Sequence, residues 1–316
     1  MKLKVVRRLT GIGIAILSGS TPFAAQAQTL TAQQILSEFN AVVINNFNSV
    51  ADVEGRLVAG NIQSGATFYN NPSAQSGAST FQAVNAVTIS GCNTCNVDNN
   101  GNVNYVTSNS GSYNLNGGAL KKNDPAFSMS AFTTPLNSLV TTLGGLTANS
   151  SINGSDPNNF TFNINPNSQG VAIFDVAESQ LSTAANLDFK GSASTIIVNV
   201  TGAAGYAFAQ NFNFNDVTMT AGDLANHVIW NFENAGSLNL KLWQGAVLAP
   251  DATVTNNSPI QGSLYALNFN GQGELHDHPF QGSVSAFSVP GPVAGAGLPA
   301  FLGLLGFCLY RRRSAA

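Results

Sequence analysis

The chain has 316 residues, of which 44% are hydrophobic and only 9% are charged, and 31 of them are glycine. Soluble globular proteins carry about 25% charged residues, so this composition argues against an ordinary cytosolic enzyme. The length and the apolar content allow a sizeable core and argue against general disorder.

The charges are unevenly distributed along the chain. All 15 acidic residues lie between Glu38 and Asp277, where only five basic residues accompany them, so this part has a net charge of −10. The remaining basic residues lie near the two ends. Nucleic acid is therefore excluded as a partner of the body, because neutralising phosphates requires a basic surface.

The first 27 residues have the three parts of a secretory signal peptide. A basic stretch from Lys2 to Arg8 precedes a short apolar run over residues 9–17. This run is shorter than the roughly 20 residues that span a bilayer, which disfavours the alternative of a retained membrane helix. We therefore expect export through the Sec machinery and cleavage at a small-x-small motif formed by Ala25 and Ala27 before Gln28.

A helix is predicted at the start of the mature chain. Thr31 and Gln34 have the spacing of a capping box, in which each side chain accepts a hydrogen bond from the backbone of the other. An apolar stripe then follows at helical spacing, which predicts a helix that caps or lies along a larger core. The stripe consists of Ile35, Leu36, Phe39, Val42 and Val43.

Beyond this helix the pattern changes to short strands bounded by Gly, Asn or Ser. The clearest strand-like runs are residues 56–59, 86–89, 195–200 and 246–249. A second helix is predicted between Pro125 and Leu146, and we expect Pro135 to break it.

Three Gly-x-Val/Leu steps suggest a repeat near the end of the body. They begin at Gly245, Gly262 and Gly282, at intervals of 17 and 20 residues. Such intervals fit one coil of a β-solenoid, in which successive coils stack their apolar side chains. The sequence therefore predicts a mainly β fold, a right-handed β-helix-like solenoid with an N-terminal capping helix. A Greek-key β-sandwich is the alternative.

The C-terminal end carries a second sorting signal. An apolar stretch over residues 293–310 is just long enough to span a membrane, and the arginines after it should stay on the cytoplasmic side. This tail resembles the PEP-CTERM signal, which implies processing by an exosortase, with Gly291 in the place of the usual glutamate. A permanent anchor is the alternative. The motif and the basic cluster are Val289, Pro290, Gly291, Pro292, Arg311, Arg312 and Arg313.

Segments at both ends of the body resemble the choice-of-anchor A domain. The opening segments are residues 39–43 and 52–61, and the closing ones are 245–254, 260–266 and 273–276, with Pro279 and Phe280. The resemblance implies an exported bacterial surface protein whose C-terminal anchoring device varies, and it brings no characterised catalytic mechanism. We therefore divide the chain into a signal peptide (1–27), a β domain (28–288) and a sorting tail (289–316).

The densest group of acid–base side chains is Glu274, His276, Asp277 and His278. On a strand, Glu274, His276 and His278 would share one face and could form a three-ligand metal site. A solvated polar edge is the alternative, and it is favoured.

Asp52, Glu54 and Arg56 form a second charged group. Alternate residues of a strand share a face, so we expect Arg56 to pair with one of the two carboxylates. Glycoside hydrolysis requires two catalytic carboxylates at a set separation, and the sequence does not place a second carboxylate at that distance.

The Asn-rich segment 98–102 could offer oxygen ligands to calcium. A plain turn is favoured, because the segment holds only one carboxylate.

Cys92 and Cys95 form a Cys-x-x-Cys motif in a chain predicted to be exported. An oxidising compartment favours a local disulfide over zinc binding or redox catalysis. The third cysteine, Cys308, lies in the apolar tail.

These observations favour a non-catalytic protein of the cell surface or extracellular matrix, without a cofactor, which is adhesive or associated with exopolysaccharide. The membrane is involved through residues 293–310 before processing, or permanently if the tail is retained. The alternative is a secreted carbohydrate-active or polysaccharide-binding protein. Its sugar-stacking residues would be Trp230, Phe232, Trp243 and Tyr265.

Overall fold

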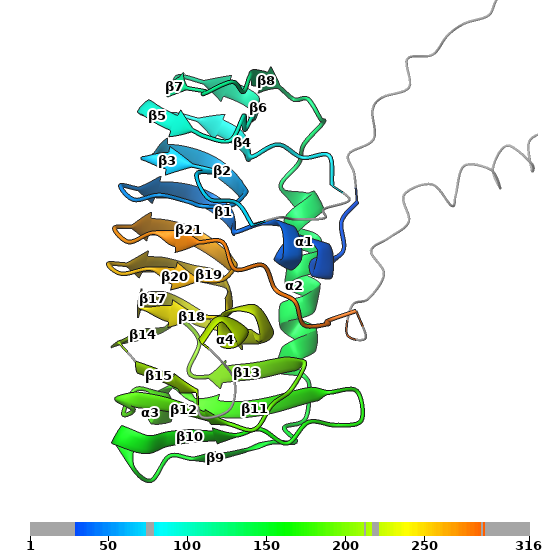
Figure 1. The fold of residues 1–316 in the computed structure, drawn as a ribbon, viewed down its shortest axis with the longest axis vertical. Helices are drawn as coiled ribbons and strands as arrows, with labels where there is room; N and C mark the ends of the chain where they lie inside the picture. The colour runs from blue at the N-terminus through cyan, green and yellow to red at the C-terminus, as the bar shows by residue number, and fades with distance from the viewer. Residues whose placement is uncertain (1–28, 74–78, 212, 217–220, 286, 288–316) are drawn as a thin grey trace, which may run out of the picture.

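The protein is described by a computed structural model that covers residues 29–73, 79–211, 213–216, 221–285 and 287. It is a β-solenoid, a stack of coils in which each strand pairs in parallel with the equivalent strand of the next coil (Figure 1). The solenoid prediction is thus confirmed against the β-sandwich. The signal peptide and the sorting tail lie outside the described residues. Within the described ranges, no helix is long and apolar enough to cross a membrane.

The upper half of the stack comes from the N-terminal part of the chain. Apolar residues alternate with polar ones along these strands, and the apolar side chains point into the coil. Its strands are β1 (Ala41–Ser49), β2 (Leu57–Ser64), β3 (Thr67–Phe68), β4 (Val84–Ile89), β5 (Asn93–Val97), β6 (Val103–Asn109), β7 (Ser112–Asn114) and β8 (Leu120–Lys122).

The lower half follows a long helix, α2 (Ser130–Gly144), which runs along the stack (Figure 1). Its short helices are η1 (Pro157–Asn159), α3 (Glu178–Leu181) and α4 (Ala221–His227). Its strands are β9 (Ser151–Asn153), β10 (Phe160–Asn163), β11 (Val171–Ala177), β12 (Asn186–Lys190), β13 (Thr195–Thr201), β14 (Tyr206–Asn211), β15 (Asn213–Asp216), β16 (Val228–Asn231), β17 (Ala235–Lys241), β18 (Trp243–Gln244), β19 (Ala246–Asn256), β20 (Ile260–Gln261), β21 (Leu264–Gly271) and β22 (Leu275–His276).

The two halves join in the middle of the stack. The main sheet has the order β11-β13-β16-β19-β21-β1-β2-β4-β6-β8, so the last long strand pairs with the first. Ala41 is the register partner of Leu264, and the pairing is parallel. The chain therefore starts a coil at mid-height, climbs to the top, returns along α2 to the base and climbs back to its starting point.

Each regular coil has three walls, because bulges bend the long strands. In β1 the bend falls between Val43 and Asn46, and in β19 it falls between Ala249 and Thr253. Residues before the bend form the helix-covered wall, and residues after it form what we call the polar wall. The third wall consists of the short strands β3, β5, β7, β18, β20 and β22, linked by bridges from Val53 to Phe68 and Leu275.

Helix α2 covers the first wall and is held there by apolar and polar contacts. Its buried side chains include Phe132, Leu136 and Leu139, which pack in one cluster with the outward residues of the wall. The side chains of Asn199 and Asn231 donate hydrogen bonds to carbonyl oxygens near the C-terminal end of the helix, those of Leu143 and Val140. These contacts fix the helix to the sheet.

Pro135 does not break α2, contrary to the sequence prediction. It lies in the second turn, where it removes one hydrogen bond, and the helix continues to Gly144. Tertiary packing outweighs this loss, because the buried face on both sides of Pro135 rests on the sheet.

The N-terminal helix is shorter than predicted. The capping box of Thr31 and Gln34 is confirmed, but α1 (Ala32–Glu38) ends before the stripe does, and Val42 and Val43 belong to β1. Val42 and Val43 are in a strand because pairing with β2 and β21 gives their backbone N–H and C=O groups hydrogen-bond partners. The helix also caps neither end of the solenoid, since it lies beside α2 at mid-height (Figure 1).

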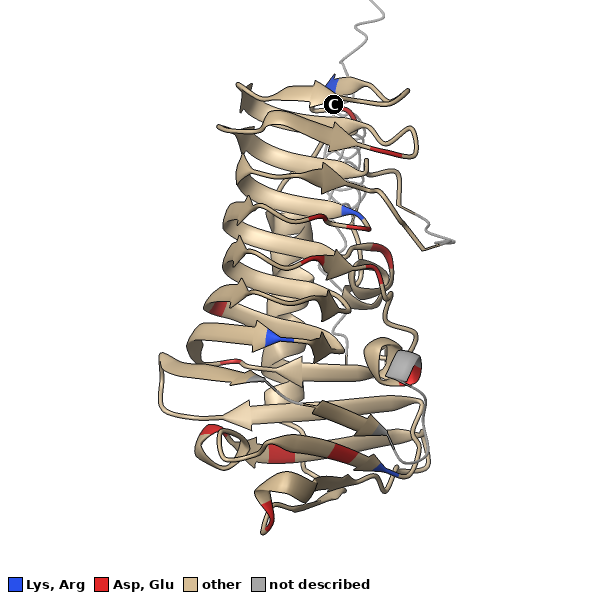
Figure 2. Cartoon of the chain, turned by 60° about the vertical axis from the view of Figure 1, so that its left-hand side comes forward, with Lys and Arg blue, Asp and Glu red and all other residues tan. Residues whose placement is uncertain are grey.

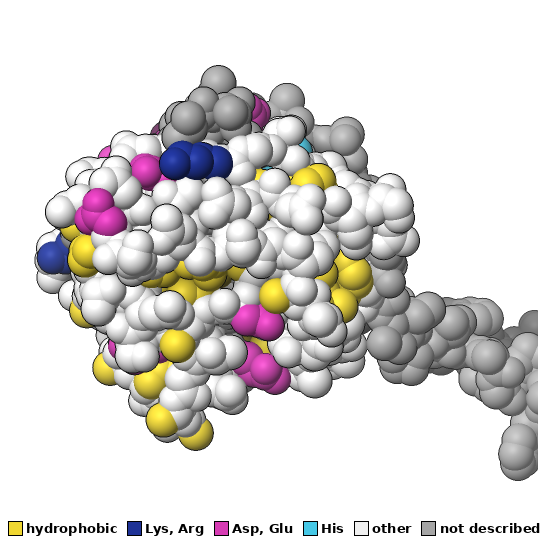
Figure 3. All heavy atoms as spheres, turned by 90° about the horizontal axis from the view of Figure 1, so that it is seen from below, with side chains coloured by type: hydrophobic (Ala, Val, Ile, Leu, Met, Phe, Trp, Pro, Cys, Tyr) yellow, Lys and Arg dark blue, Asp and Glu magenta, His cyan; other side chains and the backbone are white. Residues whose placement is uncertain are grey.

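The interior of the solenoid is filled with aromatic and aliphatic side chains. Trp230, Phe232 and Trp243 are fully buried there, and the Trp230 and Trp243 rings lie 4.9 Å apart. Tyr265 is buried under α2, where its hydroxyl donates to Asn137 Oδ1 at 2.7 Å. These four residues are therefore core residues and cannot stack on sugars. Seen from below, the base shows mainly backbone and uncharged polar side chains, with apolar side chains and a few acidic and basic ones among them (Figure 3).

Two of the three predicted glycine corners are coil corners. Gly245 and Gly262 have φ values of +106° and +146°, and the Gly262 amide donates to the carbonyl oxygen of His276 in the next coil. Gly282 is not a corner, because it follows β22, after which the chain leaves the stack and the Phe280 amide donates to Leu36. The four strand predictions lie within β2, β4, β13 and β19, except that β2 starts at Leu57.

Candidate functional site: an uncharged polar wall

The polar wall presents short uncharged side chains in rows across the coils. Its strands alternate, so that Phe47, Val254 and Phe269 point into the core while their neighbours point outward. The first outward row follows the register from one coil to the next. It consists of Ser237, Thr253, Asn268, Asn46, Asn61, Thr88 and Ser108.

Hydrogen bonds connect the middle of this first row into a ladder. Asn268 Nδ2 donates to Thr253 Oγ1 at 3.3 Å, Asn46 Nδ2 donates to Asn268 Oδ1 at 3.5 Å, and Asn61 Nδ2 donates to Asn46 Oδ1 at 3.2 Å. The Asn46 amide N–H also donates to Asn268 Oδ1 at 3.2 Å. Each amide is thus held in one orientation by its neighbour, which makes the row rigid.

The second outward row lies two residues further along the strands, and three residues further in β2, where the register shifts. It consists of Asn239, Thr255, Asn270, Asn48 and Ser64. Ser64 Oγ is hydrogen bonded to Asn48 Oδ1 and to the Ser49 carbonyl oxygen, while Asn48 and Asn270 are exposed. This row therefore offers more accessible groups than the first.

The two rows form a repeating array without charge. Neighbouring strands are about 4.8 Å apart, and residues two apart on a strand are about 6.7 Å apart. All twelve outward residues are Ser, Thr or Asn. Figure 2 shows how widely Lys, Arg, Asp and Glu are separated along the stacked strands. The array can therefore donate and accept hydrogen bonds repeatedly at any moderate pH.

Glu274, His276 and His278, the weaker alternative of a metal face, do not share the face of one strand. Strand β22 ends at His276, so the alternation does not reach His278. His276 Nε2 lies 2.9 Å from Glu274 Oε2. Burial and the neighbouring His276 lower the pKa of His278, against a smaller opposite effect of Glu54. Among the residues that the structure describes, no group of three His, Cys, Asp or Glu side chains is placed to hold a metal ion.

Arg56 does not pair with Asp52 or Glu54, as the sequence had suggested. Its guanidinium lies 3.4 Å from Glu38 Oε2, because the last residue of α1 lies beside the residue that precedes β2. Asp52 Oδ1 accepts from the Thr67 amide at 3.0 Å, and Glu54 accepts from the Asp277 amide at 2.8 Å. Both carboxylates thus hold turns of neighbouring coils in place.

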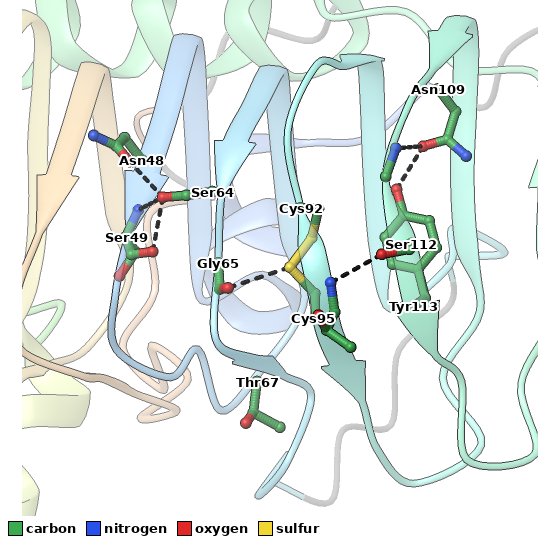
Figure 4. The surroundings of a disulfide bond; sticks show 12 residues. Asn48, Ser49, Ser64, Gly65, Thr67, Cys92, Cys95, Asn109, Ser112 and Tyr113 are labelled. Atoms are coloured by element: carbon green, nitrogen blue, oxygen red, sulfur yellow. Dashed lines mark hydrogen bonds between the residues drawn. A yellow bond between two sulfur atoms is a disulfide. The ribbon is translucent and has the colours of Figure 1, made fainter.

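Cys92 and Cys95 are joined in a disulfide at the corner between β4 and β5 (Figure 4). Both residues are buried, and Cys95 Sγ lies 3.2 Å from the Gly65 carbonyl oxygen of the adjacent coil.

In the 98–102 segment, Asn99 and Asn100 adopt positive φ, and Asp98 accepts a hydrogen bond from Asn116. This segment is a turn between coils.

The fold and the polar wall define a class of protein, a β-solenoid with a helix along one wall and a repetitive uncharged array on another. Residues 32–277 match a family model described as "Putative Ice-binding-like adhesive domain". This span includes most of the chain, so the chain belongs to that family.

A search of the solved structures gives a crystal structure of an ice-binding protein from an Antarctic ascomycete, Antarctomyces psychrotrophicus. The identity is 13%, the alignment covers 79% of this chain and 98% of that one, and the TM-score is 0.27. A search of the curated proteins gives no match.

Proposed function

We propose that this chain is an exported, non-catalytic surface protein that adheres to extended, uncharged, hydrated surfaces through its polar wall. The observation that carries the proposal is the pair of uninterrupted Ser/Thr/Asn rows. Membership of an ice-binding-like adhesive family supports it.

The physics of the wall suits binding to a repetitive surface. Each hydrogen bond to a ligand contributes little, because it replaces one to water. Many of them on one rigid array add up, since the linked amides of Asn46, Asn61 and Asn268 are ordered before binding. The side chains of the two rows carry no charge that would have to be desolvated, which removes a large cost of burying a polar surface.

The ligand class that we favour is a neutral exopolysaccharide, whose hydroxyls recur along the chain. Ice is the second candidate, because the strand spacing imposes a regular two-dimensional repeat on the wall. The two candidates share the wall and differ only in the surface that it contacts.

Charged substitutions on the second row test the proposal. The double variant Asn48→Asp/Asn270→Asp places two carboxylates on adjacent strands of the wall. We expect it to lose cosedimentation with insoluble neutral glucans at least about tenfold, since each carboxylate would be desolvated on contact.

The matched control is Asn153→Asp/Asn165→Asp, which adds the same charge at exposed positions near the base. It should bind as the natural chain does. In a second outcome, the natural chain fails to bind glucans and slows ice recrystallisation. If Asn48→Asp/Asn270→Asp then loses this effect and the control variant keeps it, ice is the ligand. If neither surface is bound, or if both variants bind equally, the proposal is wrong.

The two ends of the chain support a sorting route for this adhesin. Residues 1–27 would be removed on export, and the tail from Val289 would be processed in the manner of PEP-CTERM proteins, as the choice-of-anchor A resemblance of residues 28–288 also suggests. Intact-mass analysis of the protein from fractionated native cells tests this route. A C-terminus near Pro290 in the surface fraction supports it, and retention of Arg311–Arg313 in the inner membrane contradicts it.

The absence of catalysis is part of the proposal. The carboxylates named as candidates, Asp52, Glu54 and Glu274, accept hydrogen bonds within the fold. We expect no release of reducing sugar from polysaccharides. Release that disappears when one of these three residues is changed to Ala would overturn this part.

A further inference from the structure

The third wall contains a groove that the proposed adhesion does not use. It has a volume of about 390 Å³ and lies beside the two sheet edges β15 and β18, which belong to different sheets. Its polar lining consists of the amide side chains of Asn186, Asn213, Asn215, Gln244 and Gln261. Its apolar lining consists of Phe214 and Leu242.

The groove exists because the regular stacking stops at this point. Strand β18 pairs with β20 on one side, and β15 pairs with β12 in the separate base sheet. The two edges therefore leave a space with side chains from both sheets around it. Its volume lies within the range typical of small-ligand sites, about 300 to 1,000 Å³.

Leu242 lines this groove with a strained backbone conformation and an exposed side chain. Its φ is +49°, in the left-handed region that a leucine rarely adopts, and 48% of its side chain is exposed. Strained backbone and an exposed large apolar side chain both oppose stability, and such features cluster at functional sites. A ligand with an apolar face would cover this side chain.

The amides of the groove are partly ordered and partly unsatisfied. Asn213 Nδ2 donates to Asn186 Oδ1 at 2.9 Å, and Asn215 Nδ2 donates to Asp188 Oδ1 at 3.0 Å, which fixes the orientation of both donors. Gln244 Oε1 is buried and has no hydrogen-bond partner. A buried acceptor without a partner is costly, and rotation of the Gln244 side chain toward the groove would let a ligand donor satisfy it.

The lining residues decide the class of ligand. None of the lining residues that the structure describes is charged, so these side chains offer neither a counter-charge to a phosphate nor a carboxylate to a metal ion. An amide offers a donor and an acceptor side by side, which matches a pair of neighbouring hydroxyls. We propose that the groove binds a neutral saccharide of one or two units, with its C–H face on Leu242 and Phe214.

This inference is independent of adhesion through the polar wall. A soluble disaccharide fills the groove without an extended surface, and an extended surface can bind the wall with the groove empty. The two proposals can therefore fail separately.

The test uses the full chain, titrated with cellobiose, maltose and lactose, and with glucose 6-phosphate as a charged comparison, followed by NMR of the side-chain amides. We expect saturable shifts with at least one neutral disaccharide, centred on Asn213, Asn215, Gln244 and Gln261. Glucose 6-phosphate should bind at least about tenfold more weakly.

Leu242→Gly is the decisive variant. Glycine adopts a positive φ without strain, so the fold should keep its thermal midpoint while the affinity for the disaccharide falls at least about tenfold. Leu120→Ala, at another leucine that is 42% exposed, is the matched control and should bind normally. Asn213→Leu, at an exposed position, provides a second variant that should fold and lose affinity.

Three outcomes would overturn the proposal. They are the absence of saturable shifts with all three disaccharides at millimolar concentrations, shifts centred on another part of the surface, and unchanged affinity in a folded Leu242→Gly. Loss of glucan cosedimentation in Asn48→Asp/Asn270→Asp with unchanged disaccharide binding would support two separate sites.

Discussion

The side chain of Asn40 donates a hydrogen bond to the main-chain carbonyl oxygen of His276 at 3.0 Å, although 236 residues separate them in the chain. The same amide donates to the Gly262 carbonyl oxygen at 2.9 Å, and its oxygen accepts from the Gly55 amide at 3.2 Å. One buried side chain thus ties the first coil of the chain to the last two. The polar wall crosses this junction, so its regularity depends on the contact.

Replacing Asn40 with Ala should loosen the junction. The change removes the side-chain partner of the Gly55 amide and of the Gly262 carbonyl oxygen, while the His276 carbonyl oxygen keeps the Gly262 amide, and we expect a loss of about 3 kcal/mol in the free energy of unfolding. Asn48→Ala, at an exposed position, should cost about 0.5 kcal/mol or less. Urea denaturation measures both. Equal stabilities would show that the junction does not depend on Asn40.

Trp230 should be essential to the core and irrelevant to ligand contact. Its ring is fully buried and its Nε1 donates to the Gln244 carbonyl oxygen at 2.8 Å. Trp230→Ala should cost about 3 to 5 kcal/mol, through the cavity and the lost hydrogen bond. Trp230→Phe retains most of the packing and should cost less. A Trp230→Ala variant with undiminished stability in thermal unfolding would contradict the buried position.

Pro135→Ala should stabilise the protein. Alanine restores the amide that can donate to the Ala131 carbonyl oxygen, and it removes the steric conflict within α2. We expect a gain of about 1 to 3 kcal/mol, because the proline penalty in a helix interior is about 3 kcal/mol and the freer unfolded chain of the alanine variant offsets part of it. Thr134→Ala, at an exposed neighbour, should change little. A loss of stability in Pro135→Ala would mean that the ring packs in a way that alanine cannot replace.

His278 should lower the free energy of unfolding as the pH falls. Burial lowers its pKa in the folded state, His276 lowers it further, and Glu54 opposes both. The unfolded chain therefore binds this proton more readily, so stability is lost as the pH falls from about 7 through the ordinary value near 6.5 and below. His278→Gln should flatten this part of the stability curve relative to the natural chain. An identical pH dependence in the two proteins would contradict the assignment.

The sequence predicted those parts of the fold that depend on local patterns. The capping box of Thr31 could be predicted because its partner Gln34 lies three residues away. The 17-residue interval between Gly245 and Gly262 corresponds to one coil of the solenoid. The pairing of Ala41 with Leu264 left no such trace, because it joins distant segments. The end of α1 was misplaced for the same reason, since the partners of Val42 lie in β2 and β21.

The polar wall was missed although a signal for it exists. The triplets Asn46-Phe47-Asn48, Thr253-Val254-Thr255 and Asn268-Phe269-Asn270 each place one apolar residue between two polar ones. Read singly, each is an ordinary strand. Their alignment into rows depends on coil register, which turns three unremarkable triplets into one array. The groove beside Leu242 has no sequence signal, because it forms between the edges of two sheets.

Site-directed blocking of the polar wall tests the central claim most directly. Asn270→Cys and Thr134→Cys, exposed on the polar wall and on α2 respectively, are each coupled to a polyethylene glycol maleimide, with Cys308 common to both proteins. We predict that the polymer at position 270 abolishes adsorption to the surface that the natural chain binds, while the polymer at position 134 leaves it intact. Adsorption that survives at position 270 and disappears at position 134 would place the adhesive surface on the helix side and contradict the account.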